Sequence, residues 1–182
     1  MKKVVFVLFV LLAGFQAQAQ RYLTKNGKIF FSSDTPFEKI EAKNDQVNAA
    51  LDIATGDIVF KVLMKSFEFD RALMQEHFNE NYVESDKFPN ALFKGKVNNL
   101  KSIPFSKDGT YEADIEGDLT IHGVSKHIKA KGTFENKDNK ITGKSKFQIK
   151  VEDYGIKVPK AVTEKIANSI EIQVLVILNP LK

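Results

Sequence analysis

Apolar and polar residues alternate along the stretch from Thr110 to Val151. Between Tyr111 and Ile121 the odd positions are apolar or small, and the even positions are acidic or Thr. A period of two is typical of a strand with one buried and one solvated face. Asp138-Asn139 is a typical tight-turn pair. The pattern therefore predicts three consecutive antiparallel strands of about ten residues each.

Shorter runs with the same period lie on both sides of this stretch. Each places apolar residues on one face, and the last also carries Leu175 and Ile177 on the other face. Together with the three clear strands, they predict about eight or nine strands in all. The runs are Lys28–Ser33, Phe37–Asn44, Val47–Ile53, Ile58–Met64, Ala91–Val97 and Ser169–Leu178.

Two segments break the alternation and predict short helices. Asp70 is a typical N-cap residue, and a helix is expected over Arg71–Tyr82. Pro159 is expected to begin a second helix that ends at Ile166. The first helix carries an apolar stripe at three- and four-residue spacing, formed by Leu73, Met74, His77 and Phe78.

About eight long, one-sided strands in one domain must bury all their apolar faces. Closing the sheet on itself does this and removes the exposed strand edges, whereas a two-sheet sandwich is the alternative. The strands are long and the connections between neighbours are short. We therefore expect an all-β fold, a closed antiparallel barrel of about eight strands with one or two short helices.

The N-terminal segment has the pattern of a secretory signal peptide. Lys2 and Lys3 precede the apolar run Val4–Phe15, and Ala17-Gln18-Ala19 fits the cleavage pattern of small residues. The run is too short to span a bilayer as a helix. We expect a signal peptide over residues 1–19, cleavage near Ala19, and a barrel domain over residues 20–182. The mature protein is expected to be periplasmic or secreted, without a stable membrane anchor.

Composition excludes several classes of function. The net charge is +4, and removing Lys2 and Lys3 leaves +2, which is too low to indicate nucleic-acid binding. The chain contains no Cys, so packing must stabilise it, and fifteen Phe supply much of the core. The three His lack metal-ligand spacing, and no nucleophile elbow or phosphate loop occurs. We expect no enzyme activity, no cofactor and no metal.

The inward faces of the three clear strands contain many small residues. In a closed eight-stranded barrel, small inward residues leave room for one ligand. Alternatively, glycines relieve strand coiling and large neighbours fill the gap. The pattern leaves both interpretations open. The small residues are Ala113, Gly117, Ala130, Gly132, Gly143 and Ser145, with Leu119, Phe134, Phe147 and Ile149 around them.

Five segments of the mature chain carry recognisable motifs: Phe67-Glu68-Phe69-Asp70, Met74-Gln75-Glu76-His77-Phe78, Phe88-Pro89-Asn90-Ala91-Leu92-Phe93, Gly117-Asp118-Leu119-Thr120-Ile121-His122-Gly123-Val124-Ser125-Lys126 and Asp153-Tyr154-Gly155-Ile156. Together these motifs resemble the YceI-like family of exported lipid-binding barrels. The resemblance runs through most of the mature chain and implies an extended lipocalin-like barrel. It also implies an interior that binds isoprenoid-tailed or fatty amphiphiles.

The candidate ligand-binding residues fall into two groups. His77, His122 and Tyr154 are candidates for a polar head group, although His122 has the outward parity of a surface turn. For the helix stripe, docking of the helix on the barrel is the favoured interpretation. The apolar lining is expected to be Phe69, Met74, Phe78, Phe93, Ala113, Leu119, Ala130, Gly132, Phe134, Phe147 and Ile149.

The function expected from these observations is binding of a long apolar amphiphile. The ligand would be an isoprenoid, a quinone or a fatty-acid-like molecule, held inside the barrel by an exported carrier or store. A non-carrier role on the same fold, as a stress-related, structural or interaction protein or as an unrecognised enzyme, is the alternative. The oligomeric state, including a homodimer, is left open.

Overall fold

A computed structural model describes residues 20–181; the predicted signal peptide lies outside them. Eight antiparallel strands form one barrel, and the two-residue strand β4 (Glu68–Phe69) extends it. The predicted alternation is confirmed for the three clear strands, which are β6, β7 and β8. The barrel strands are β1 (Arg21–Asp34), β2 (Lys39–Asp52), β3 (Asp57–Leu63), β5 (Asn90–Val97), β6 (Gly109–Ile121), β7 (Val124–Lys137), β8 (Lys140–Lys150) and β9 (Ser169–Pro180).

The barrel closes because β1 pairs with both β9 and β2. The strand order is β1-β9-β8-β7-β6-β5-β3-β2, and the closing ladder runs from Arg21 opposite Asp52 to Asp34 opposite Lys39. β4 pairs with β2 at Ala42 and Lys43, beyond the part of β2 that pairs with β3. The expected closed barrel is therefore confirmed, and the sandwich alternative is not formed.

Two tight turns connect the long central strands. Asp138 and Asn139 have φ values of 50° and 58°, and His122 and Gly123 have values of 52° and 75°. Positive φ at both central residues is the requirement of a type I′ hairpin turn, which suits the twist of antiparallel strands. The predicted Asp138-Asn139 turn is confirmed, and His122 lies in the second turn.

The first predicted helix is present but begins differently. α1 (Ala72–His77) continues into a π-helical turn, Phe78–Tyr82, so together they cover residues 72–82. The expected N-cap Asp70 is wrong, because the cap position is Arg71, which makes no side-chain capping bond. The Arg71 side chain instead pairs with Glu38, which lies between β1 and β2.

The second predicted helix is reduced to a single 3₁₀ turn, Lys160–Val162. The bonds in this segment join residues three apart, from the Val162 N–H to the Pro159 carbonyl and from the Lys165 N–H to the Val162 carbonyl. A segment of about eight residues gains too few hydrogen bonds to offset helix nucleation. The chain between β8 and β9 is therefore mostly irregular.

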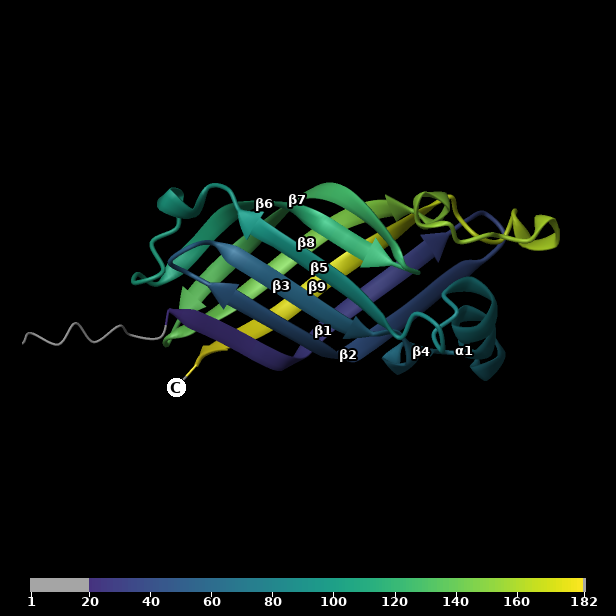
Figure 1. Ribbon diagram of the computed structural model, residues 1–182, viewed down its shortest axis with the longest axis horizontal. Helices are drawn as coiled ribbons and strands as arrows, with labels where there is room; N and C mark the ends of the chain where they lie inside the picture. Colours follow the sequence, from purple (N-terminus) through teal and green to yellow (C-terminus); the bar gives the residue numbers. More distant parts are fainter. Residues whose placement is uncertain (1–19, 182) are drawn as a thin grey trace, which may run out of the picture.

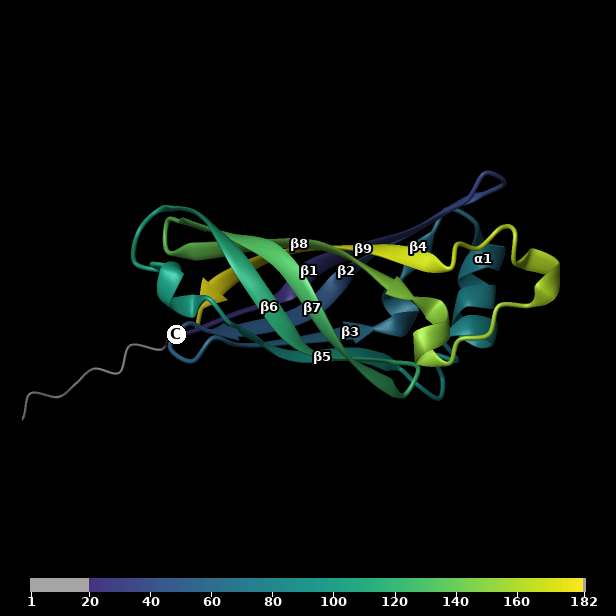
Figure 2. The same ribbon diagram turned by 90° about the horizontal axis from the view of Figure 1, so that it is seen from above.

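The barrel has two unlike halves along its length (Figures 1 and 2). α1 and the segment between β8 and β9 lie at one end, and the C-terminus lies at the other. We call the half under α1 the helix-covered half and the other the packed half. Residues 98–108 close the packed half, where the ring centroids of Phe105 and Phe134 are 5.8 Å apart. Its buried residues are Tyr22, Ala49, Leu51, Ile58, Val97, Ile103, Ala113, Phe134, Ile141, Val176 and Leu178.

Candidate ligand-binding site

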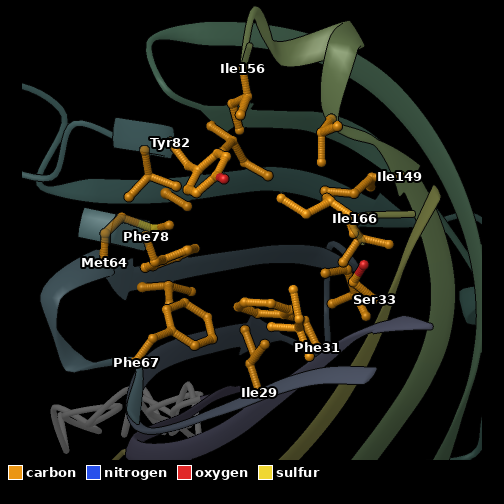
Figure 3. A pocket seen from close by; sticks show the side chains of 18 of the residues that line it. Ile29, Phe31, Ser33, Met64, Phe67, Phe78, Tyr82, Ile149, Ile156 and Ile166 are labelled. Carbon is orange, nitrogen blue, oxygen red and sulfur yellow. The ribbon is translucent and has the colours of Figure 1, made fainter. Parts of the chain in front are cut away.

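A cavity of about 490 Å³ occupies the helix-covered half of the barrel. This volume lies within the range of small-molecule pockets. All eight barrel strands contribute to its wall, as do α1 and the segment between β8 and β9. Figure 3 shows the side chains around it, which are almost all apolar; those labelled are Ile29, Phe31, Ser33, Met64, Phe67, Phe78, Tyr82, Ile149, Ile156 and Ile166.

A cluster of four phenylalanine rings forms one wall. Phe31 on β1 lies 5.3 Å from Phe67, 5.7 Å from Phe69 and 5.6 Å from Phe78, measured between ring centroids. Phe78 also contacts Phe67 and Phe69 at 5.6 and 5.1 Å. Pairing of β4 with β2 holds Phe69 at the barrel rim. Three of these pairs are edge-to-face, Phe31–Phe78 is stacked and Phe69–Phe78 is tilted, and aromatic pairs of this kind stabilise the wall beyond simple burial.

α1 covers this end of the barrel without being deeply packed. Leu73, Met74 and His77 line the cavity, yet no residue of α1 is fully buried, and Leu73 is 61% exposed. An element with few buried apolar contacts opens at lower free-energy cost than the core strands. Moving the helix away from the barrel is therefore expected to cost less free energy than opening a core strand.

The segment between β8 and β9 forms the facing wall. Val158, Val162 and Ile166 line the cavity, together with the partly exposed Ile156. The Ala167 N–H donates a hydrogen bond of 2.8 Å to the Ser33 hydroxyl, which is buried. This bond attaches the irregular segment to β1.

Few polar groups reach the cavity. The Tyr82 hydroxyl points toward it in Figure 3, and burial raises the pKa of Tyr82, so the hydroxyl stays protonated at neutral pH. Arg71 and Glu38 form an ion pair at the rim, and Lys165 lines the facing wall. The arrangement suits an apolar molecule with a small polar end, and in residues 20–181 no group of three His, Asp or Glu is arranged to hold a metal.

Most of the predicted lining residues lie in the cavity wall, and three do not. Ala113 and Phe134 belong to the packed half, and Gly132 also lies outside the wall. A Cβ atom at Gly132 would come within 2.6 Å of the Lys144 carbonyl oxygen, so this glycine allows β7 and β8 to approach. The predicted residues in the wall are Phe69, Met74, Phe78, Phe93, Leu119, Ala130, Phe147, Ile149 and, among the head-group candidates, His77.

The other two head-group candidates lie outside the cavity wall. His122 Nε2 is 2.5 Å from Glu84 Oε2, and His122 Nδ1 is 3.2 Å from the Tyr154 carbonyl oxygen. Tyr154 is 1% exposed, and burial, with a smaller contribution from Asp153, raises the pKa of its phenol to about 12. His122 and Tyr154 thus connect the turn between β6 and β7 with the segment after α1 and the segment after β8.

Several wall residues were not among the sequence candidates. Phe31, Phe67 and Tyr82 reach the cavity from β1, from the residue before β4 and from the helical turn after α1. Phe67 and Phe69 lie on either side of the charged Glu68, which is the spacing of a strand face. Tyr82 lies four residues after Phe78, which is the spacing of a helix face. Both spacings could have indicated these residues from the sequence. Ile156 and Ile166 lie in irregular backbone, which has no periodicity to indicate their direction.

Comparison with known proteins identifies the family. Residues 22–178 match the model of the YceI-like domain. The chain belongs to the YceI-like family. A UPF0312 protein from Pseudomonas putida (strain F1) is 30% identical over 99 residues, which are 51% of this chain and 48% of that protein. A UPF0312 protein from Pseudomonas fluorescens (strain SBW25) is 30% identical over 112 residues, which are 58% of this chain and 55% of that protein. The matches thus span about half the length of these relatives.

Solved structures share the fold of this YceI-like chain at low sequence identity. A polyisoprenoid binding domain from Saccharophagus degradans, implicated in plant cell wall breakdown, has a TM-score of 0.77 and 12% identity. That match covers 90% of this chain and all of the other. BcnA from Burkholderia cenocepacia has a TM-score of 0.69 and 16% identity, with 84% of this chain and 95% of the other covered. At these identities the likeness concerns the fold. Within residues 20–181, none of the helices has the length and apolar character needed to span a membrane.

Proposed function

We propose that this protein binds a long apolar amphiphile, such as an isoprenoid, a quinone or a fatty-acid-like molecule, as an exported carrier or store. The observation that carries the proposal is the apolar cavity of about 490 Å³ within the helix-covered half. An apolar void of this size destabilises a protein when empty. A bound apolar chain would remove that cost.

The energetics favour an apolar chain over a polar substrate. Each methylene group transferred from water into an apolar wall contributes about 0.8 kcal/mol. A chain that fills the cavity therefore needs little polar recognition. His77 and Tyr82, on the helix and on the turn after it, line the cavity and are candidate partners for a polar head group. The structural neighbour described as a polyisoprenoid binding domain supports a lipid-like ligand.

Export is part of the same proposal. The basic, apolar and small-residue pattern of residues 1–19 supports removal of that segment during secretion. A water-filled compartment next to a membrane is where a long apolar molecule requires a protein container. The periplasm or the extracellular medium would be that compartment.

The test is extraction of the protein purified under native conditions from an exporting host. The organic extract should contain about one lipid or quinone per protein chain, identified by mass spectrometry, because the apolar wall retains it during purification. The intact mass of the same sample should correspond to a chain that begins at Gln20. An extract that is empty in repeated preparations contradicts the binding function, and an uncleaved chain contradicts export.

A further inference from the structure

Two phenylalanines lie at the boundary between the two halves of the barrel. Phe60 on β3 and Phe93 on β5 are direct cross-strand partners, with ring centroids 6.3 Å apart. Both line the cavity and both pack against the core of the packed half. Ile115 on β6 and Val174 on β9 do the same from other strands. We call these four side chains the floor of the cavity.

A pair of glycines provides the space for the Phe93 ring. A Cβ atom at Gly95 would lie 2.5 Å from Cζ of Phe93, so the ring occupies the place that a side chain would take. Gly117 is the partner of Gly95 on β6, and a Cβ atom there would lie 2.3 Å from the Gly95 Cα atom. Strands β5 and β6 are therefore in close contact next to the ring. This contact positions the ring, and with it the floor, along the barrel axis.

We propose that Phe60 and Phe93 limit how much of a ligand chain the barrel can bury, an inference that rests on the proposed function. The cavity has a volume of about 490 Å³ and ends at the floor, so only a limited length of an apolar chain fits inside it. Beyond the floor, buried side chains such as Leu51, Ile58 and Phe134 form the core of the packed half. Carbons that do not fit into the cavity therefore extend out of it past α1.

The test uses four prenyl alcohols with ten, fifteen, twenty and forty carbons. Their affinities are measured by competition against a bound fluorescent apolar dye. Between ten and fifteen carbons the affinity should rise by more than about tenfold, since each buried methylene contributes about fourfold. Between twenty and forty carbons it should change by less than about twofold, because the added carbons bury no further surface.

Variants of the floor should move this limit. Phe93→Ala removes the ring and deepens the cavity, so the steep rise should extend to a longer alcohol than in the wild-type protein. Phe93→Leu removes less volume and serves where the alanine variant does not fold. Leu73→Ala is the matched control at the open end, where the exposed Leu73 lines the cavity. It should weaken every alcohol by a similar factor and leave the limit unchanged.

The outcomes separate this inference from the proposed function. A steep rise that continues to forty carbons in the wild-type protein overturns the length limit while supporting apolar binding. A limit that stays at the same length in a folded Phe93 variant overturns the role of the floor. Failure of all four alcohols to bind contradicts both the inference and the proposed function.

Discussion

At the residue scale, only two of the six small inward residues, Ala130 and Ser145, line the cavity. A Cβ atom at Gly143 would lie 3.2 Å from the Phe134 ring, so that ring fills the space above the glycine. Gly132 has no side chain and so allows β7 and β8 to lie close together. These two residues follow the alternative interpretation of the pattern, in which glycines relieve strand geometry and large neighbours fill the gap. Ala130, by contrast, lines the cavity.

Ala113 and Ala130 provide a matched pair because both point inward, one in each half. Ala113→Leu inserts volume into the packed half and should lower the free energy of unfolding by about 1–3 kcal/mol. Ala130→Leu fills cavity space and should leave the free energy of unfolding unchanged or raise it by up to about 2 kcal/mol. It should weaken apolar ligands by about tenfold or more, because it displaces buried carbons of the ligand. Urea unfolding and dye competition measure the two effects; equal ligand losses in both variants would contradict the division into halves.

At the element scale, the strands were predictable from periodicity and the ends of the helices were not. Alternation identified β6, β7 and β8 because an antiparallel strand with one wet face leaves a period of two in the sequence. The start of α1 depends on a tertiary contact, the pairing of Arg71 with Glu38, which lies more than thirty residues earlier. The segment Pro159–Ile166 has the residues of a helix but lacks the length to form one.

The segment after α1 is attached to the barrel by His122 and Glu84. The hydrogen bond from His122 holds the pKa of Glu84 below its usual range, with smaller charge contributions from Lys87 and His122. A carboxylate with a depressed folded-state pKa stabilises the fold above its unfolded pKa, and this contribution is lost as the pH falls through the folded pKa.

Glu84→Gln should therefore lower the melting temperature at pH 7. The difference between wild type and variant should narrow as the pH falls below about 4, the region of an unperturbed Glu. Circular dichroism melts between pH 3 and pH 7 measure this difference. A melting-temperature difference that is constant from pH 3 to pH 7 would contradict a charged Glu84 in the folded protein.

At the scale of the whole molecule, periodicity predicts the barrel but not the position of the cavity along it. The parity of a residue in a strand indicates which face it occupies. It carries no information about height along the barrel axis, which depends on strand register and on the segments that cover each end. Ala113 and Ala130 share the inward face, yet the register places Ala130 opposite the floor residue Ile115 and Ala113 opposite Gly132, two residues farther toward the packed half.

The central claim is that the helix-covered half holds an apolar ligand, and thermal unfolding with added twenty-carbon prenyl alcohol tests it most directly. A ligand at about 100 times its Kd that binds only the folded state adds about 2.7 kcal/mol of stability. For a domain of this size, the melting temperature should rise by about 5–10 °C. In Ala130→Leu, a tenfold or greater loss of affinity should reduce the rise by about half or more. An unchanged melting temperature in the wild-type protein, measured on a sample already freed of bound lipid, would contradict the account.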